Sequence, residues 1–285
     1  MADRRVLLSF GHGYSARALS GPLLAAGWEV IGTTRTEEKA EAIRKTGAEA
    51  IVWPGSDVAP LLDRATHLLI SAGPTADGDP VLAALGDRIQ ARAAAFDWVG
   101  YLSTTGVYGD RGGDWVDESS ACKPSTRRGK WRLAAEQAWQ AIDGLPLHIF
   151  RLAGIYGPGR GPFSKVRAGT ARRIIKPGQV FSRIHVEDIA AVLAASIARP
   201  APGAIYNVCD NLAAPPQDVL AHAAELLGLP VPPAVPIEEA EMSEMARSFY
   251  AESKRVSNRR IREELGVELR YPTYREGLRA LMDAE

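Results

Sequence analysis

The residues best suited to bind a ligand lie in a glycine-rich turn near the start of the chain. The run Gly11-His12-Gly13-Tyr14-Ser15-Ala16 follows an apolar segment, 6–10, and opens a segment with helical character. It fits G-x-G-x-x-A, in which the first glycine permits a tight turn, the second lets a pyrophosphate approach the backbone, and the alanine allows close helix–strand packing. Free N–H groups at the helix start would face the phosphates. The motif predicts a dinucleotide site at Gly11, Gly13, Tyr14 and Ser15; a glycine-rich turn that binds nothing is the alternative.

The end of the second apolar run bears on the choice of nicotinamide cofactor. A site that prefers NAD usually places an acid there for the ribose 2′-hydroxyl, whereas this run ends Thr33-Thr34-Arg35-Thr36. Arg35 flanked by hydroxyls suits a 2′-phosphate, through charge-assisted and bidentate hydrogen bonds. Glu37 and Glu38 come slightly later and are expected to begin a helix. We therefore expect NADP(H) to be favoured over NAD(H); a surface arginine near a helix start is the alternative.

Strand-sized apolar runs alternate with longer helical segments in the first half of the chain. Strands are expected at 6–10, 30–34, 50–53, 68–71, 98–103 and 147–152, and helices at 15–26, 37–45 and 81–96. Apolar strands separated by helices predict an α/β fold with a doubly wound parallel sheet of the Rossmann type. From Gly154 onward glycine and proline become dense, and a strand at 205–208 is expected to return to the sheet. We expect a dinucleotide-binding domain over 1–154, joined by 186–208, and a smaller C-terminal substrate lobe over most of 155–285.

The composition excludes several classes of protein. The 285 residues carry 34 Lys and Arg against 34 Asp and Glu, without the basic excess of a nucleic-acid clamp or a membrane-surface binder. No uncharged stretch approaches the roughly 20 residues that span a bilayer, and the N-terminus does not resemble a signal peptide, so we expect a cytoplasmic protein. Cys122, Cys209 and five scattered histidines provide neither a disulfide framework nor metal-ligand spacing, so no metal is expected.

Further motifs follow one another in order along the chain. They are Tyr101-Leu102-Ser103-Thr104-Thr105-Gly106-Val107-Tyr108-Gly109-Asp110; Arg151-Leu152-Ala153-Gly154-Ile155-Tyr156-Gly157-Pro158-Gly159; Ile184-His185-Val186-Glu187-Asp188-Ile189-Ala190; Tyr206-Asn207-Val208; and Ser253-Lys254-Arg255-Val256-Ser257-Asn258 with Tyr271-Pro272-Thr273-Tyr274. Over nearly its whole length the chain thereby resembles the extended short-chain dehydrogenase/reductases, the NAD-dependent epimerase/dehydratase family, and in particular its atypical members.

The resemblance implies roles for individual residues. Thr104 falls where the family keeps a catalytic Ser or Thr, whose hydroxyl hydrogen-bonds the substrate oxygen; a strand-end hydroxyl is the alternative. It also implies that Ala72 and Gly73 face the cofactor, that Asp57 lies near the adenine, and that the segment from Leu152 to Ile155 passes the nicotinamide. Members commonly form homodimers through two long helices, so a homodimer is possible here.

The family's Tyr-x-x-x-Lys pair is replaced in this chain. In Arg128-Gly129-Lys130-Trp131-Arg132-Leu133-Ala134-Ala135-Glu136, Arg128 stands in the tyrosine slot and Arg132 in the lysine slot. Arginine stays protonated and is a poor general acid, but it can hold an alkoxide, carboxylate or phosphate. Arg132 could instead pair with Glu136 on a solvated helix face. Tyr108 or Tyr156 could replace the lost acid, although no spacing argument selects either.

Two functions remain open on these grounds. One is an NADP(H)-binding oxidoreductase or epimerase acting on a small anionic or nucleotide-sugar-like substrate. The acid-free cluster Arg160, Lys165, Arg167, Arg172, Arg173, Lys176 and Arg183 agrees with an anionic ligand, although a solvated basic surface explains it equally well. The other is a catalytically inactive regulatory or scaffold protein that senses NADP(H).

Overall fold

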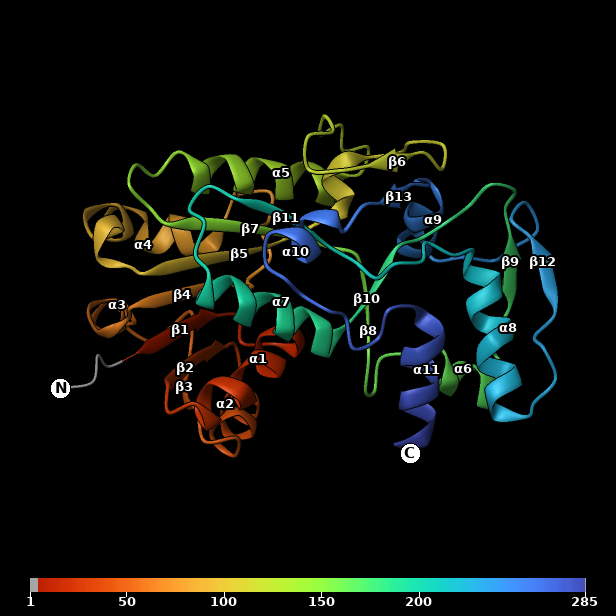
Figure 1. Ribbon diagram of the computed structural model, residues 1–285, viewed down its shortest axis with the longest axis horizontal. Helices are drawn as coiled ribbons and strands as arrows, with labels where there is room; N and C mark the ends of the chain where they lie inside the picture. Colours follow the sequence, from red (N-terminus) through yellow and green to blue (C-terminus); the bar gives the residue numbers. More distant parts are fainter. Residues whose placement is uncertain (1–4, 285) are drawn as a thin grey trace. The chain divides into compact units, whose positions relative to one another are not determined.

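Two compact units make up the chain, which we describe from a computed structural model over residues 5–284 (Figure 1). Unit 1 comprises Met1–Thr104, Lys130–Arg151 and Ile189–Tyr206; unit 2 comprises Thr105–Gly129, Leu152–Asp188 and Asn207–Glu285. The segment 105–129, which the sequence division placed in the dinucleotide-binding domain, belongs to unit 2.

A seven-stranded parallel sheet is the centre of the fold. Its order is β11-β7-β5-β4-β1-β2-β3, where the strands are β1 (Val6–Phe10), β2 (Glu29–Thr34), β3 (Glu49–Val52), β4 (His67–Ile70), β5 (Trp98–Thr104), β7 (Leu147–Leu152) and β11 (Ile205–Val208). Leu8 of β1 lies beside Ile31 of β2 and Leu68 of β4, and all three are fully buried. Consecutive strands run one way from β1 and the other way from β4, so the strand order reverses between them. In such sheets ligands bind at the carboxyl ends of the strands beside the reversal.

Helices cover both faces of this sheet in unit 1 (Figure 1). On one face α3 (Ala59–Arg64), α4 (Pro80–Ala91) and α5 (Arg127–Gln140) enclose a core that includes Phe10, Tyr101 and Trp139. On the other lie α1 (Tyr14–Ala25) and α7 (Val186–Ala198), where Trp98 Nε1 donates to Ser196 Oγ at 3.0 Å. α2 (Glu37–Arg44) packs along β2 and β3. The doubly wound prediction is confirmed.

One expected helix is shorter than predicted. The segment expected to be helical over 81–96 ends as an α-helix at Ala91 and continues as a 3-10 turn, Ala93–Ala95. Arg92 leaves helical geometry at φ −110° and ψ 6°, and Phe96 then enters the core in an extended conformation.

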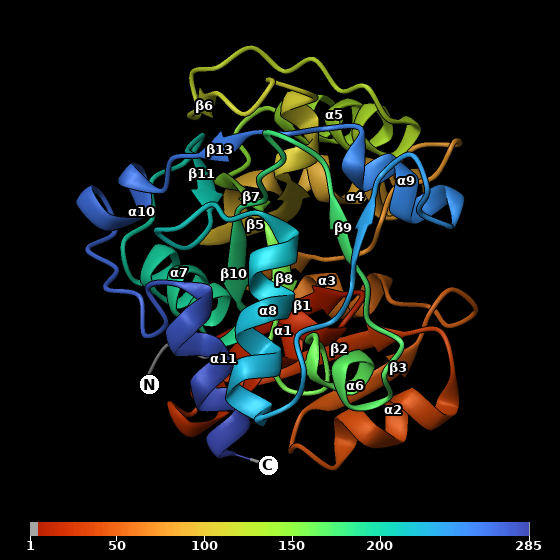
Figure 2. The same ribbon diagram turned by 90° about the vertical axis from the view of Figure 1, so that its right-hand side faces the viewer.

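Unit 2 has its own apolar core and three two-stranded parallel sheets. The sheets pair β6 (Trp115–Val116) with β13 (Arg255–Val256), β8 (Gly154–Tyr156) with β10 (Arg183–His185), and β9 (Arg173–Ile175) with β12 (Ala234–Pro236). The helices are α6 (Phe163–Arg167), α8 (Pro216–Leu227), α9 (Glu244–Tyr250), α10 (Arg259–Glu263) and α11 (Tyr274–Asp283), with a 3-10 turn at Thr105–Tyr108. α8 and α11 lie side by side and bury Val219, Tyr274 and Leu278 (Figure 2). Within residues 5–284 no helix has the length and apolar character needed to cross a membrane.

Candidate functional site

The predicted glycine turn lies at the point where the strand order reverses. Gly11 has φ +75°, and a Cβ placed there would approach the backbone N of Ala72 to 2.8 Å, so only glycine fits. Its N–H donates to Thr33 Oγ1 at 2.9 Å, and the N–H of His12 donates to Thr33 O at 2.8 Å. The turn after β1 is therefore fixed to β2 on one side and rests against the end of β4 on the other.

The start of α1 has the properties of an anion-binding helix end. Gly13 is the N-cap, and no side chain of the described chain caps it. The first turn, which begins with Tyr14 and Ser15, contains no acidic residue. A twelve-residue helix that begins in this way presents N–H groups and the positive end of its dipole, which suits a phosphate.

His12 occupies a variable position of the G-x-G-x-x-A motif. Its ring is buried; Nε2 lies 2.8 Å from Ser20 Oγ on α1, and the ring packs over Gly32 of β2. A Cβ on Gly32 would come within 2.6 Å of His12 Cγ. Burial, with a smaller contribution from Arg17, lowers the pKa of His12 to about 4, so the ring is neutral at pH 7. Nothing in the motif indicates that this side chain points inward.

The end of β2 leaves Arg35 without a partner while its neighbours are engaged. The Thr33 hydroxyl accepts from the Gly11 N–H, and Thr36 Oγ1 caps α2 by accepting from the Lys39 N–H at 3.4 Å. Each of these two hydroxyls therefore accepts a hydrogen bond within the protein and still has its proton to donate. Arg35 is exposed and makes no hydrogen bond or ion pair within the described residues. Glu37 is paired with Arg44.

The remaining predicted cofactor and substrate residues fall in both units. In unit 1, Ala72 and Gly73 follow β4, Thr104 is the half-buried last residue of β5, and Asp57 Oδ1 accepts the N–H of Ala59 at 2.9 Å. In unit 2, Leu152 ends β7 and Ile155 lies in β8.

Arg132, in the lysine slot, reaches the ends of β4 and β5. Its Nη1 donates to Tyr101 OH at 3.2 Å and to Leu102 O at 2.9 Å, and its guanidinium lies 5.5 Å from the centre of the Tyr101 ring. Its Nη2 is 3.7 Å from the position of a Cβ on Gly73. The alternative in which Arg132 pairs with Glu136 is wrong, because Glu136 is buried against Arg151, with Nη2 to Oε2 at 2.8 Å.

Arg128, in the tyrosine slot, is exposed in the first turn of α5 and has no partner among the described residues. The following Gly129 is required by packing, since a Cβ there would lie 2.9 Å from Pro124 Cβ and 3.0 Å from Gly106 O. Its N–H is accepted by Thr126 Oγ1 at 3.1 Å, so the helix start that carries Arg128 has a defined geometry.

No tyrosine among the candidates is available as a surface acid. Tyr108 is fully buried and donates to Asn207 Oδ1 at 2.8 Å, and burial raises the pKa of Tyr156, whose hydroxyl donates to Thr273 O at 3.4 Å. Burial also raises the pKa of Tyr101 to about 12. The Tyr101 and Tyr156 hydroxyls keep their protons at neutral pH, and all three hydroxyls are hydrogen-bonded to other residues.

The basic segment of unit 2 is largely occupied by backbone carbonyls. Arg172 donates to Gly169 O, Arg173 to Pro232 O, Lys176 to Tyr250 O, and Arg183 to Phe181 O and Ala214 O. These four cations therefore join the loops of unit 2 to one another through hydrogen bonds to backbone carbonyls. This role differs from both interpretations of the sequence, an anion-binding segment and a solvated basic surface. His185 is buried between Tyr156 and Tyr271, which agrees with a structural role.

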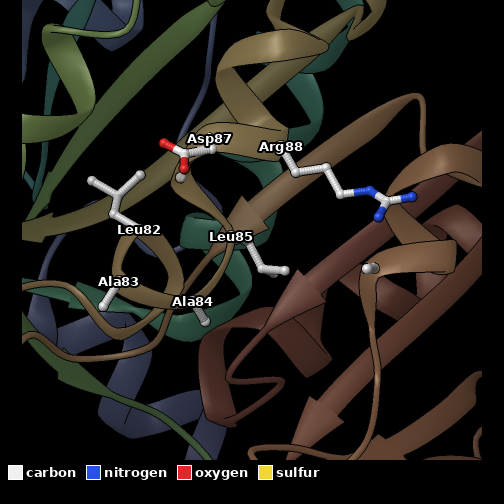
Figure 3. A pocket seen from close by; sticks show the side chains of 8 residues that line it. Leu82, Ala83, Ala84, Leu85, Asp87 and Arg88 are labelled. Atoms are coloured by element: carbon white, nitrogen blue, oxygen red, sulfur yellow. The ribbon is translucent and has the colours of Figure 1, made fainter.

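One pocket of the protein lies away from the predicted site residues, and no metal-binding cluster is found in the described part of the chain. A pocket lined by Ala59 and residues 82–88 lies along α4 (Figure 3), and it contains none of the residues predicted to bind cofactor or substrate. Among residues 5–284, no group of three or more His, Cys, Asp or Glu side chains is arranged to hold a metal ion.

The strand order defines a doubly wound Rossmann fold, and solved structures share this fold. The human epimerase family protein SDR39U1 (isoform 2), solved with NADPH, aligns with a TM-score of 0.76 at 19% identity, covering 98% of this chain and 99% of that one. The UDP-glucose 4-epimerase of Thermus thermophilus, solved with NAD, aligns with a TM-score of 0.75 at 20% identity, covering 98% of each chain.

More similar proteins identify the family. The chain is 30% identical over 275 residues to protein YeeZ of Escherichia coli K12, covering 92% of this chain and 94% of that protein. It therefore belongs to the YeeZ family. A structure described as a functionally unknown conserved protein from Silicibacter pomeroyi DSS is 66% identical, with a TM-score of 0.96 over 98% of this chain and 99% of that one. No model of a known protein family matches the chain.

Proposed function

We propose that the protein binds a nicotinamide dinucleotide across the carboxyl ends of β1, β2 and β4 and uses it in oxidoreductase or epimerase chemistry. The observation that carries this proposal is the turn at Gly11, where only glycine fits against Ala72 and the following helix begins without a cap or an acid. Structures of the same fold with NADPH and with NAD support a cofactor of this class.

Each part of the cofactor has a candidate partner in unit 1. The N–H groups of the turn and of the first residues of α1 would hold the pyrophosphate. The free guanidinium of Arg35 would take a 2′-phosphate, which is why we favour NADP(H); the nearby Glu37 is already paired with Arg44. Asp57 would lie near the adenine, and Ala72 and Gly73 would line the path of the nicotinamide half.

The substrate is proposed to be a small anionic or nucleotide-sugar-like molecule. The bound cofactor would supply or accept the hydride. Thr104 would hydrogen-bond the substrate oxygen, while Arg128 and Arg132 would stabilise negative charge that develops on it. Arginine does not release its proton at neutral pH, so these residues act by charge and hydrogen bonding.

The binding proposal is tested by titrating the protein with NADPH and NADH and following the fluorescence of the reduced nicotinamide. We expect NADPH to bind at least tenfold more tightly, because hydrogen bonds to a charged group contribute about 1.5–3 kcal/mol. Arg35→Ala should remove this difference. Lys39→Ala, an exposed cation on the neighbouring helix, is the matched control and should retain it. Tighter binding of NADH would overturn the role of Arg35, and binding of neither cofactor would overturn the proposed function.

A second function, NADP(H) sensing without turnover, is favoured by one observation: Tyr101, Tyr108 and Tyr156 are buried and hydrogen-bonded, so none of these three is exposed to replace the missing acid. The two functions differ in a screen of carbonyl compounds and nucleotide sugars with NADPH. An enzyme consumes NADPH with at least one of them, and Arg128→Ala abolishes that turnover while NADPH binding remains. A sensor consumes none, yet NADPH raises its Tm.

A further inference from the structure

Unit 2 contains a buried ion pair between Lys254, which directly precedes β13, and Glu252. The Nζ atom of Lys254 lies 2.7 Å from Glu252 Oε2, and each of the two side chains is 10% exposed. An ammonium group has three N–H bonds to donate. The ammonium of Lys254 donates only to Glu252 among residues 5–284, so two of its N–H bonds are free to donate to a ligand.

The carboxylate of Glu252 has a partner on each oxygen. Oε2 accepts from Lys254, and Oε1 accepts the hydroxyl of Ser125 at 2.5 Å. The backbone at Glu252 is fixed as well, because its O accepts Nε2 of the buried Gln179 at 2.6 Å. The next residue, Ser253, accepts the N–H of Val180 on its Oγ at 3.1 Å. Glu252 therefore orients the ammonium of Lys254, and both of its oxygens are already used.

Ser125 joins this ion pair to the segment in which the family's acid is missing. Its residue is exposed and lies three positions before Arg128, which occupies the tyrosine slot. The segment between them has a fixed geometry: the N–H of Gly129 donates to Thr126 Oγ1 at 3.1 Å, and a Cβ on Gly129 would lie 2.9 Å from Pro124 Cβ. All of these residues belong to unit 2. Two consecutive hydrogen bonds, both printed by the fold of one unit, thus connect the Lys254 amine to the start of α5.

We propose that Lys254 is the proton donor of the proposed reaction and that Glu252 and Ser125 are positioning residues; this inference rests on the proposed function. Arginine does not release a proton at neutral pH, so Arg128 cannot act as the acid. Tyr108 and Tyr156 are buried and hydrogen-bonded to other residues. Lysine is among the side chains that serve as general acids, and Lys254 is held in one orientation with N–H bonds to spare.

The step that Lys254 completes is the reduction of a substrate carbonyl to an alcohol. The bound dinucleotide, in its reduced form, supplies a hydride, a hydrogen with its electron pair, to the carbonyl carbon. The electron pair of the C=O π bond moves to the oxygen, one N–H bond of Lys254 breaks, and its proton forms the O–H bond. The neutral amine then regains a proton from solvent. NADPH, a carbonyl compound and one proton thereby give NADP⁺ and an alcohol, and in the reverse direction the neutral amine accepts the proton.

The experiment uses the carbonyl compound that consumes NADPH fastest with the wild type, or NADH if that cofactor binds more tightly. Lys254→Arg keeps a positive charge opposite Glu252 but cannot release a proton at neutral pH. Lys254→Ala leaves room for a small amine added to the solution. Lys123→Arg and Lys123→Ala, at an exposed lysine of the same unit, are the matched controls. Each variant is measured for kcat, for the Kd of the cofactor and for its Tm.

We expect both Lys254 variants to lower kcat by roughly 100-fold or more, because general acids contribute on the order of 10²–10⁴-fold. The Kd of the cofactor should stay within about twofold of the wild type, as should every value for the controls. Ethylamine should restore part of the kcat of Lys254→Ala, whereas tetramethylammonium, a cation without an N–H bond, should not. A purely structural role of Lys254 would not produce this difference between the two cations.

Wild-type kcat in folded Lys254→Arg would overturn the inference and leave the proposed function intact. A loss in Lys254→Ala that ethylamine does not reverse, or that both cations reverse equally, would also overturn it, because Lys254 would then act only on the structure of unit 2. If the wild type consumes the reduced cofactor with no carbonyl compound, the proposed enzymatic function fails first and the inference with it.

Discussion

Glu136 determines what the two arginines of α5 can do. Its carboxylate is 1% exposed, and both oxygens are engaged: Oε2 with Arg151 Nη2 at 2.8 Å, and Oε1 with Arg151 Nε at 3.2 Å and with the Ser103 hydroxyl. Because these contacts occupy Glu136, Arg132 one helical turn earlier is released toward Tyr101 and Gly73. The acid that could have neutralised the candidate site instead holds β5 and β7 to α5.

This role predicts a large loss of stability for Glu136→Gln. The variant leaves Arg151 buried without its counter-charge, and breaking a buried pair from one side typically costs about 3–5 kcal/mol of the free energy of unfolding. Urea denaturation followed by circular dichroism measures it. Arg128→Gln, an exposed change on the same helix, is the control and should stay within about 0.5 kcal/mol of the wild type. Equal stabilities of the two variants would contradict the assignment of Glu136 as the partner of Arg151.

Residues whose role follows from local backbone geometry were predictable, and residues whose role depends on a distant partner were not. Gly11 and the start of α1 follow from a motif in which spacing alone specifies a turn and a helix end. The pairing of Glu136 with Arg151 requires α5 to lie against β7, and the inward turn of the Thr33 hydroxyl requires the β1 turn to lie against β2. Lys254 belongs to a motif of the sequence that gives it no role; its connection to Ser125 through Glu252 exists only in the folded chain.

At the scale of elements, the strands of the seven-stranded sheet were predicted to within about a residue because most of them are short, mainly apolar runs buried on both faces. The strands at Val6–Phe10, Leu147–Leu152 and Ile205–Val208 have the predicted ends. α3 was not anticipated, since six residues are too few to show a helical period. The same limit applies to the strands of two or three residues in unit 2, whose pairing depends on partners far away in sequence.

The turn after β1 and the strand β2 form one packed assembly, which Gly32→Ala should disrupt. The new methyl group would enter the space of the His12 ring, at 2.6 Å from Cγ and 2.7 Å from Cβ, so the turn itself must move. Overpacking of this kind costs roughly 1–3 kcal/mol, and a displaced turn should also weaken binding of the dinucleotide. Chemical denaturation and NADPH titration measure the two effects.

A double variant separates packing from other causes. His12→Gly removes both the ring and the Cβ that the new methyl group would meet, so Gly32→Ala should cost little in that background and the two changes should be strongly non-additive. Additive losses in the double variant would show that the glycine is needed for some reason other than room for His12.

At the scale of the whole molecule, neither the distribution of charge along the sequence nor the order of its segments showed which segments pack together in unit 2. The cations between 160 and 183 suggested a basic surface, yet most of them donate to carbonyl oxygens of unit 2. The segment 105–129 follows β5 in sequence but belongs to unit 2, because Asp110 accepts the N–H of Ser253 at 2.7 Å and Ser125 donates to Glu252 at 2.5 Å. Contacts that span more than a hundred residues leave no trace in local spacing.

Three buried groups change the dependence of stability on pH in opposite directions: His12 and His67 of unit 1 in one, and Asp210 of unit 2 in the other. In unit 1, burial lowers the pKa values of His12 and His67 from 6.5 to about 4. The unfolded chain takes up protons there before the folded chain does, so unit 1 loses stability as the pH falls from about 6.5 to 4. In unit 2, burial raises the pKa of Asp210 from 3.8 to about 7, an effect that a backbone hydrogen bond and Arg183 only partly offset. Between these values the unfolded chain is ionised while the folded chain keeps its proton, so unit 2 loses stability as the pH rises from about 4 to 7.

Asp210→Asn tests the second of these dependences. The amide resembles the protonated carboxyl and still offers an oxygen to the N–H of Leu212, which Oδ1 accepts at 3.1 Å. Because one pKa unit corresponds to about 1.4 kcal/mol, the variant should be more stable than the wild type by on the order of 2–4 kcal/mol at about pH 8, and nearly equal to it near pH 4. Urea denaturation at the two pH values measures this difference, with the exposed Asp218→Asn as the control that should change little at either. A gain of the same size at both pH values would mean that the amide stabilises unit 2 by better hydrogen bonding, and that the buried carboxyl does not destabilise the folded protein by holding its proton.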